Sequence, residues 1–100
     1  MITAELTIIP IGTNSTSLSS FVAAAVNALD KTGVKYKITG MGTQIESNSF
    51  QELVKAIEFA HEAVFANGAE RVSTIIKIDD RRDKDRKLAD KMLSVEKKLI

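Results

Sequence analysis

Apolar and polar side chains alternate along the first segment of the chain, from Ile2 to Ile8. A period of two is typical of a strand that is covered on one face. Pro10 has no amide proton to donate, so it is expected to end the hydrogen-bonded ladder of this strand. The alternation returns at Val34–Ile38 and at Val72–Ile78, which predicts two further strands.

Two other segments carry apolar residues at the three- and four-residue spacing of an amphipathic helix. The first follows the polar turn Gly12–Ser17, with Ser17 as the predicted N-cap and Gly33 as the terminator. The second begins at Ser49–Glu52, which predicts a capping box, and ends at Asn67–Gly68. The apolar stripes are Leu18, Phe21, Val22, Ala25, Val26 and Leu29 in the first helix, and Phe50, Leu53, Val54, Ile57, Val64 and Phe65 in the second.

A hairpin is predicted between the two helices. Gly40 and Gly42 flank Met41, and this tight reversal returns the chain through Thr43–Ser47. The order of elements is then βαββαβ, which allows right-handed packing of two helices on one face of a four-stranded antiparallel sheet. The first and third strands lie at the centre of such a sheet. The sequence predicts an α+β, ferredoxin-like sandwich in one domain that covers residues 1–100.

The last part of the chain, residues 83–100, mixes charged residues with apolar ones at helical spacing. We expect a C-terminal helix here, as an extension of the ferredoxin-like fold. A short helix is marginal on its own in water, so its apolar stripe must lie on its own domain or on another subunit. The stripe consists of Leu88, Met92, Val95 and Leu99.

The composition narrows the classes of partner and chemistry. With a formal net charge of +1, the chain has no global field that would attract nucleic acid or an anionic membrane. It has no cysteine, and its one histidine, His61, is expected to be hydrogen-bonded at the edge of the core. Neither a zinc centre nor a nucleophile with a base can be assembled from these residues. No apolar run approaches the roughly 20 residues of a membrane-spanning helix. We expect a cytoplasmic protein that is not an enzyme and needs no metal or cofactor.

Four short motifs occur in an order that is similar to a known family. They are Pro10–Thr13, Met41–Glu46, Arg71–Val72 and Ile78–Arg82. From about Ile2 to Lys84 the chain resembles the small ferredoxin-like proteins of the thiamine-binding family. The resemblance implies non-enzymatic binding of thiamine or its hydroxymethylpyrimidine fragment, in storage, delivery, salvage or sensing. It also implies assembly with itself, as a homodimer or a homotetramer.

The ligand that the resemblance implies suggests a set of binding residues. Thiamine joins an aminopyrimidine to a positively charged thiazolium, so its receptor needs a carboxylate, hydroxyls or backbone groups, and an apolar wall. The candidate residues are Glu46 as the acid, Thr13, Ser15 and Thr43 as hydrogen-bonding groups, Tyr36 and Met41 as the wall, and Gly12 and Gly42 where backbone approaches the ligand. Family members commonly have a glycine after this glutamate. Here Ser47 and Asn48 follow it, which changes the rim of the pocket.

The two faces of the predicted sheet differ in chemistry. The helix-free face places Glu5, Thr7, Gln44 and Glu46 at its centre, where two acids need a cation or a hydrogen-bond donor. This face is expected to be solvated or to pair with a second copy of the chain, and Ile9 and Ile75 favour such pairing. The helix-covered face is expected to carry Ile2, Ala4, Leu6, Ile8, Val34, Ile38, Val72, Ile76 and Ile78.

Two alternatives belong to other functional classes. A regulatory or scaffolding oligomer of ACT-like character would bind another small molecule, such as an amino acid, at its interface. An RNA-binding sheet would expose aromatic side chains on its central strands. All four phenylalanines fall on predicted helices, so RNA binding is not expected.

Overall fold

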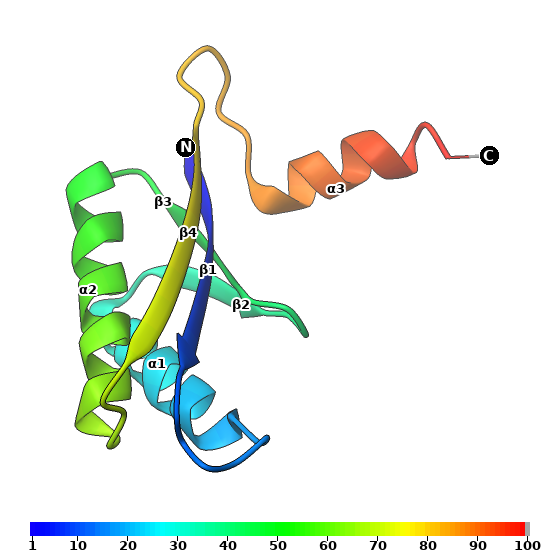
Figure 1. The fold of residues 1–100 in the computed structure, drawn as a ribbon. Coiled ribbons are helices and arrows are strands. Elements are labelled where there is room, and N and C mark those ends of the chain that lie inside the picture. Colours follow the sequence, from blue (N-terminus) through cyan, green and yellow to red (C-terminus); the bar gives the residue numbers. More distant parts are fainter. Residues whose placement is uncertain (100) are drawn as a thin grey trace.

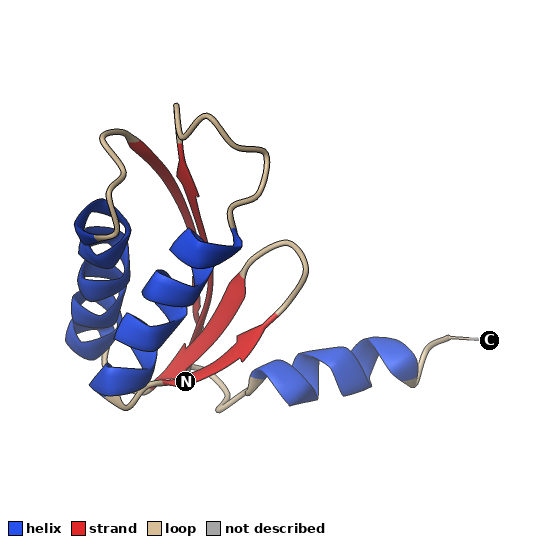
Figure 2. Cartoon of the chain, turned by 90° about the horizontal axis from the view of Figure 1, so that it is seen from below, coloured by secondary structure: helices blue, strands red, loops and turns tan. Residues whose placement is uncertain are grey.

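The computed structural model describes residues 1–99, which form one antiparallel sheet and three helices. Two helices cover one face of the sheet, and the third lies beyond its other face (Figure 1, Figure 2). The elements in chain order are β1 (Ile2–Pro10), α1 (Ser19–Thr32), β2 (Lys35–Ile38), β3 (Thr43–Ser47), α2 (Phe50–Ala66), β4 (Val72–Asp80) and α3 (Leu88–Glu96). The predicted ferredoxin-like βαββαβ order and the C-terminal helix are confirmed.

The strands lie in the order β2-β3-β1-β4, so β1 and β3 occupy the centre as predicted. The two ladders of β1 differ in length. β1 pairs with β4 from Ile2 to Pro10, but it pairs with β3 only from Ile2 to Leu6. The last residues of β1 therefore have a neighbouring strand on one side and a notch in the sheet on the other.

The core lies between the sheet and the two covering helices. Leu29 from α1, Ile45 from β3, and Leu53 and Val64 from α2 are almost fully buried. Each such side chain stabilises the fold by about 1.5–3 kcal/mol relative to exposure. Ile2, Ala4 and Leu6 of β1 complete the core on the sheet side, as predicted.

The two serines predicted as helix N-caps behave differently. Ser49 caps α2, and its Oγ accepts a hydrogen bond from the Glu52 amide at 3.2 Å. The Ser49 amide donates to Ser47 Oγ instead of to the Glu52 side chain, so only half of the capping box forms. The prediction for Ser17 is wrong: α1 begins after Leu18 without a side-chain cap, and Ser17 Oγ lies 3.4 Å from Ser19 Oγ instead of accepting from a helix amide.

The predictions for the end of α1 and for the histidine agree with the structure. Gly33 ends α1 in the left-handed region, at φ 81°, as predicted. His61 lies at the edge of the core, where its Nδ1 is 2.6 Å from Thr74 Oγ1. The prediction of a hydrogen-bonded histidine in this position is confirmed.

The predicted helix-covered face is too wide at both edges. Ile38 on β2 is 57% exposed, and Ile76 and Ile78 on β4 are 44% and 38% exposed. β2 and β4 are the edge strands, and α1 and α2 pack mainly over the centre of the sheet. Apolar alternation alone does not distinguish an edge strand from a central one, so the expectation of burial fails for these three residues.

Helix α3 contacts the helix-free face through its first turn. The Leu88 amide donates to Glu46 Oε1 at 2.8 Å, and Lys91 forms an ion pair with Asp79. The remainder of α3 extends away from the sheet (Figure 1), and Met92 and Val95 are 49% and 60% exposed. The predicted C-terminal stripe is therefore only partly placed on its own domain: Leu88 and Met92 line a cavity against the sheet, whereas Val95 and Leu99 are exposed.

No helix within residues 1–99 is both long enough and apolar enough to span a membrane.

Candidate ligand-binding cleft

The notch beside β1 opens into a cleft of about 290 Å³. Three elements enclose it: the last half of β1, the tip of the hairpin between β2 and β3, and the first turns of α1. Its lining residues are Leu6, Thr7, Ile8, Ile9, Leu18, Val22, Ala25, Ile38, Thr39, Gly40, Met41, Gly42 and Thr43. We call it the hairpin cleft.

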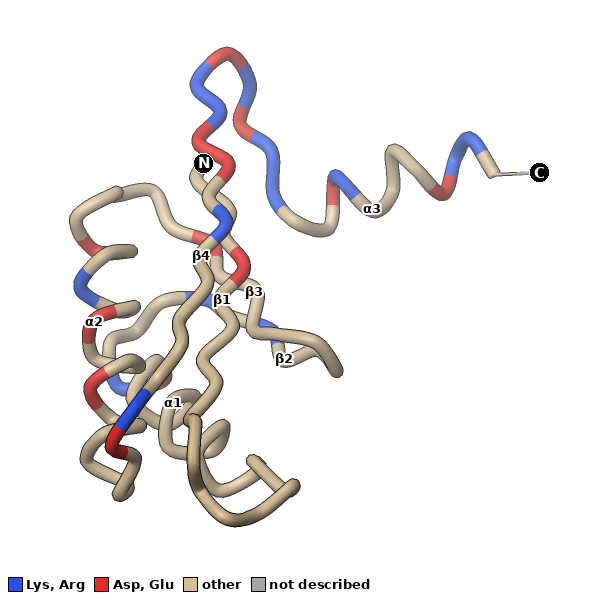
Figure 3. The backbone as a smooth tube through the Cα atoms, viewed as in Figure 1, with Lys and Arg blue, Asp and Glu red and all other residues tan. Residues whose placement is uncertain are grey.

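The lining of the hairpin cleft is apolar and contains no ionisable side chain. Its polar side chains are the hydroxyls of Thr7, Thr39 and Thr43. Charge is distributed unevenly along the backbone (Figure 3): charged residues concentrate in the connection between β4 and α3, whereas the loop from β1 to α1, beside the cleft, carries none. A ligand of this cleft is therefore selected by shape and hydrogen bonding and not by net charge.

Hydrogen bonds from Thr39 fix the hairpin tip. Its Oγ1 donates to the Gly42 carbonyl at 2.7 Å and accepts from the amides of Met41 and Gly42 at 3.3 and 3.2 Å. The Thr39 amide also donates to the Gly42 carbonyl, at 2.9 Å. The wall of the cleft that Met41 occupies is thus preorganised, although the Met41 side chain itself is 85% exposed.

Gly42 allows the hairpin tip to approach β1 closely. A Cβ at this position would lie 2.9 Å from Thr7 Oγ1 and 3.1 Å from the Leu6 carbonyl oxygen. Thr7 Oγ1 donates to the Met41 carbonyl at 3.2 Å across the same contact. Glycine is needed here for space, not for a positive φ.

Thr43 provides the free hydroxyl of the cleft. The residue is only 8% exposed and begins β3 opposite Leu6. Within residues 1–99 its Oγ1 has no hydrogen-bond partner, unlike the hydroxyls of Thr7 and Thr39. It can donate to a ligand or accept from one.

The structure does not bring the predicted site residues into one pocket. Met41, Gly42 and Thr43 line the hairpin cleft. Gly12, Thr13 and Ser15 lie in the loop between β1 and α1, outside the lining of the cleft. There Thr13 Oγ1 donates to the Ser15 carbonyl at 3.1 Å and Ser15 Oγ donates to the Ser17 carbonyl at 3.4 Å, so these hydroxyls shape their own loop.

Tyr36 packs on the helix side of the sheet. Its hydroxyl donates to Asp30 Oδ1 of α1 at 3.0 Å. This hydrogen bond to a carboxylate, together with partial desolvation and the nearby negative charge, raises the pKa of Tyr36 above its ordinary value. The ring partly fills the core next to Ile45, so Tyr36 is a packing residue at the end of α1.

Glu46 lies on the opposite face of the sheet from Thr43. Its carboxylate accepts from the Leu88 amide and lies 3.7 Å from Lys35 Nζ. The residue is 8% exposed, and together with Tyr36 it lines a separate cavity of about 150 Å³ beneath α3, so the structure brings these two predicted residues into one cavity. In this arrangement Glu46 anchors α3.

Sequence reasoning missed Thr39, and it placed Thr7 only on the helix-free face. A threonine directly before the Gly40–Gly42 turn was the available signal for Thr39, because threonine hydroxyls commonly bond to nearby turn backbone. No local signal indicates the contact of Thr7 with the hairpin tip.

Most of the chain matches a known protein family. Residues 4–96 match the thiamine-binding protein family. The chain belongs to this family. The cleft residues Met41–Thr43 and the anchor Glu46 lie within the matched segment.

Relatives within the thiamine-binding protein family extend over the full chain. A UPF0045 protein of Methanothermobacter thermautotrophicus is 61% identical over 99 residues, which are 99% of this chain and 100% of the relative. A solved structure from Methanocaldococcus jannaschii superposes with a TM-score of 0.86 at 34% identity, covering 95% of both chains. A Thermotoga maritima structure, of a protein described as a candidate for thiamine biosynthesis or salvage, has a TM-score of 0.77 at 17% identity and covers 94% of this chain and 97% of its own. This last likeness concerns the fold.

Within residues 1–99 of this family member, no group of three or more His, Cys, Asp or Glu side chains is placed to hold a metal ion.

Proposed function

We propose that the hairpin cleft binds the aminopyrimidine ring of thiamine or of its hydroxymethylpyrimidine fragment, without catalysing a reaction on it. The observation that carries the proposal is the uncharged lining with one free, nearly buried hydroxyl on Thr43. Membership of the thiamine-binding family and the thiamine-related description of the Thermotoga protein support the class of ligand. Such binding would serve storage, delivery, salvage or sensing.

The notch in the sheet complements an aminopyrimidine edge. Successive residues of a strand direct their backbone N–H and C=O groups alternately to the two neighbouring strands. Past Leu6, β1 has no β3 residue opposite it, so the groups that face the notch lack a strand partner. An aminopyrimidine presents a ring-nitrogen acceptor beside an amino donor, which is the pairing that an unpaired strand edge accepts.

The lining also favours the pyrimidine end of thiamine over its thiazolium end. A fixed positive charge in an apolar cleft is costly unless a carboxylate or an aromatic face compensates it. The cleft contains neither, and Glu46, the acid that sequence reasoning favoured, lies on the other face of the sheet and anchors α3. In bound thiamine, the thiazolium would therefore remain at the mouth of the cleft.

Calorimetric titration of the intact protein with hydroxymethylpyrimidine, thiamine and the isolated thiazole tests this proposal. We expect the first two to bind and the thiazole not to bind. Thr43→Val keeps the side-chain shape and removes one hydrogen bond, so the affinity for the pyrimidine should fall by about 0.5–1.5 kcal/mol, or roughly 2–10-fold. Thr16→Val, in the exposed part of the β1–α1 loop, is the matched control and should bind like the unmodified protein.

Two results would contradict the proposal. One is the absence of pyrimidine binding to the unmodified protein, and the other is equal affinity of Thr43→Val and Thr16→Val. A set of amino acids in the same titration covers the ACT-like alternative, which predicts binding of an amino acid and not of the pyrimidine.

We also propose that the chain assembles with itself through the helix-free face, as a dimer or a tetramer. Ile75 at 61% and Ile9 at 39% exposure leave apolar surface there, and Glu5 lies opposite Lys77 in the register of β1 and β4. A two-fold axis can match such a mixed patch with itself. The exposed side chains of α3 would then be buried against the second copy, which supplies the support that a nine-residue helix lacks alone.

A further inference from the structure

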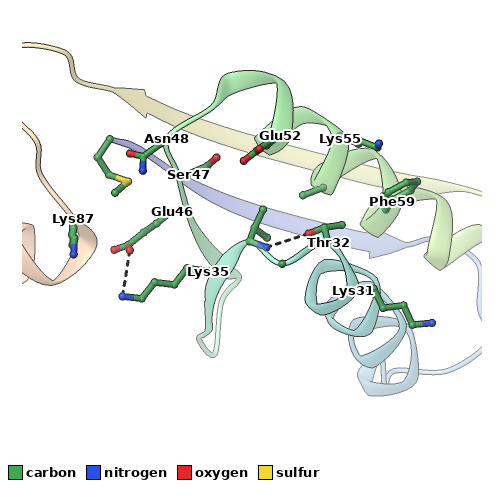
Figure 4. Close-up of a pocket in the computed structure, with 14 residues that line it drawn as sticks. Lys31, Thr32, Lys35, Glu46, Ser47, Asn48, Glu52, Lys55, Phe59 and Lys87 are labelled. Atoms are coloured by element: carbon green, nitrogen blue, oxygen red, sulfur yellow. Dashed lines mark hydrogen bonds and ion pairs between the residues drawn. The ribbon is translucent and has the colours of Figure 1, made fainter.

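A second and larger groove lies between the C-terminal end of α1 and the first half of α2, with a volume of about 610 Å³ (Figure 4). The start of β2 and the end of β3 form its base. It is separate from the hairpin cleft and shares no lining residue with it. We call it the interhelical groove.

The floor of the groove is apolar at the end where α1 and α2 face each other. Val34 and Ala56 form part of this floor, and Phe59, which also lines the groove, is 46% exposed. Lys55 Nζ lies 5.8 Å from the centroid of the Phe59 ring. An exposed aromatic ring beside an ammonium is a surface on which a planar ligand group can stack.

Positive charge is in excess around the groove. Its lining includes four lysines and the N-terminal amine, against the two carboxylates of Glu46 and Glu52. Lys35 is paired with Glu46, and the N-terminal amine lies 3.3 Å from Asp85. Among the described residues, Lys31 and Lys55 have no ion pair. Lys31 is on α1 and Lys55 on α2, and their side chains point away from each other in Figure 4.

We propose that the interhelical groove binds a small phosphate monoester that carries a planar ring. The ring would stack on Phe59 over the apolar floor, and the exposed side chains of Lys31 on α1 and Lys55 on α2 would turn toward the phosphate. A phosphate monoester carries close to two negative charges at neutral pH, which matches these two ammonium groups. Lys87, at the far end of the groove, adds to the positive field without touching the ligand.

The electrostatics also explain why the ligand needs both parts. Exposed charge pairs contribute only about 0.2–1 kcal/mol each, so two lysines alone would hold inorganic phosphate weakly. A ring that leaves water and covers Phe59 adds a stacking contribution of about 0.5–1.5 kcal/mol. Neither the phosphate nor the ring suffices, and their combination selects the ligand class.

The test uses phenyl phosphate as the probe, with inorganic phosphate and phenol as its two halves. Amide chemical shifts of the intact protein are followed during titration at low ionic strength. We expect saturable shifts around Val34, Ala56 and Phe59, with phenyl phosphate binding at least several-fold more tightly than either half. Raising the ionic strength from about 0.01 M to 0.15 M shortens the screening length from about 30 to about 8 Å and should weaken this binding.

Variants separate the two contributions. Lys31→Gln with Lys55→Gln should lower the affinity for phenyl phosphate about tenfold, because two charge pairs are lost. Lys97→Gln with Lys98→Gln removes the same net charge at the exposed end of the chain and should have little effect. Phe59→Leu should weaken binding of phenyl phosphate and leave that of inorganic phosphate unchanged.

Three outcomes would overturn the inference: no saturable shifts in the groove, equal affinity for phenyl phosphate and phenol, or an equal loss in the Lys97 and Lys98 control. Shifts confined to the amides of Gly42 and Thr43 would also overturn it, since they would place the probe in the hairpin cleft. The pyrimidine titration of the cleft is independent of all these results, so either proposal can fail alone.

Discussion

Substitution of Gly42 by alanine probes the contact on which the hairpin cleft is built. The added Cβ would lie 2.9 Å from Thr7 Oγ1, 3.1 Å from the Leu6 carbonyl oxygen and 3.4 Å from Glu5 Cγ. A rotation of the Thr7 side chain relieves only the first of these contacts and breaks its hydrogen bond to Met41. The Leu6 oxygen is backbone in the central strand of the sheet, so the hairpin tip must move instead.

Two effects of opposite sign set the expected change in the free energy of unfolding for Gly42→Ala. Inserting a methyl group into a packed contact typically costs about 1–3 kcal/mol. Replacing glycine by alanine restricts the unfolded chain and returns about 0.4–1 kcal/mol. The net loss of unfolding free energy therefore falls between about 0 and about 2.6 kcal/mol, with a centre near about 1.3 kcal/mol. Each kcal/mol corresponds to a fall in Tm of about 4–8 °C in a chain of this size.

Gly40→Ala is the matched control. Gly40 lies two residues away in the same turn, and a Cβ added there would meet no heavy atom within 4 Å. Like Gly42, it has a φ outside the positive range. The variant should gain about 0.4–1 kcal/mol, since only the unfolded chain changes. Urea unfolding of both variants at one protein concentration measures the difference, because association would otherwise alter the apparent stability.

Equal stability of the two alanine variants, or a more stable Gly42→Ala variant, would contradict the predicted clash. A double-mutant cycle with Thr7→Ala identifies the source of the strain. If Thr7 Oγ1 carries part of it, the cost of Gly42→Ala should be smaller in the Thr7→Ala background. Strain against the Leu6 carbonyl alone would leave that cost unchanged.

Three further predictions follow from exposed contacts. Asp30→Asn should lower the pKa of Tyr36 towards its ordinary value. The bond raises the folded-state pKa, so its contribution to stability is complete below the unfolded pKa near 10 and is lost as the pH rises through the folded pKa. Ultraviolet titration of this sole tyrosine measures the pKa, and an unchanged value in the variant would show that the bond is not formed. Arg82→Gln should raise the depressed pKa of Asp80. The contribution of the Arg82–Asp80 pair to stability is present above the unfolded pKa of about 3.9 and is lost as the pH falls through the folded pKa. An NMR titration in which the Asp80 carboxyl has the same pKa in both proteins would show that the two side chains do not interact. Ile75→Lys should weaken self-association and keep the helical signal; sedimentation of the unmodified protein as a monomer at micromolar concentration would refute the assembly.

Periodicity predicted the fold because each central element has a one-sided environment. β1 alternates, since one face contacts α1 and α2. In α2 the predicted stripe is buried only along its centre, at Leu53, Ile57 and Val64. The exposed members of the stripe are Phe50, Val54 and Phe65. Helix starts were less certain for a physical reason. Ser49 is the single hydroxyl that can reach the Glu52 amide, whereas Ser15, Ser17 and their serine neighbours compete with one another for the same turn. The sequence contains several capping solutions there, and local turn geometry chooses among them.

The edge strands mark a second limit. Ile76 and Ile78 continue the alternation of β4 and read as core residues, yet both are more than a third exposed. An edge position is a property of strand order and helix placement, which the local pattern does not contain. Their exposure beside α2 becomes informative only once the sheet order is known.

Two predicted site residues, Thr43 and Glu46, lie on opposite faces of the sheet, and their spacing in the sequence was enough to predict this separation. Successive side chains of a strand point to opposite faces, so two residues three positions apart cannot share a face. Thr43 lies opposite Leu6 of the core, whereas Glu46 lies opposite Thr3 on the other side of the sheet. A pocket with both residues would require a ligand to pass through the sheet. The notch that makes Thr43 accessible could not be predicted in the same way, because it depends on how far β3 pairs along β1 and on the close approach that Gly42 permits. Parity therefore assigns the hydroxyl and the carboxylate to different faces of the sheet, and the length of one ladder opens the notch beside the hydroxyl.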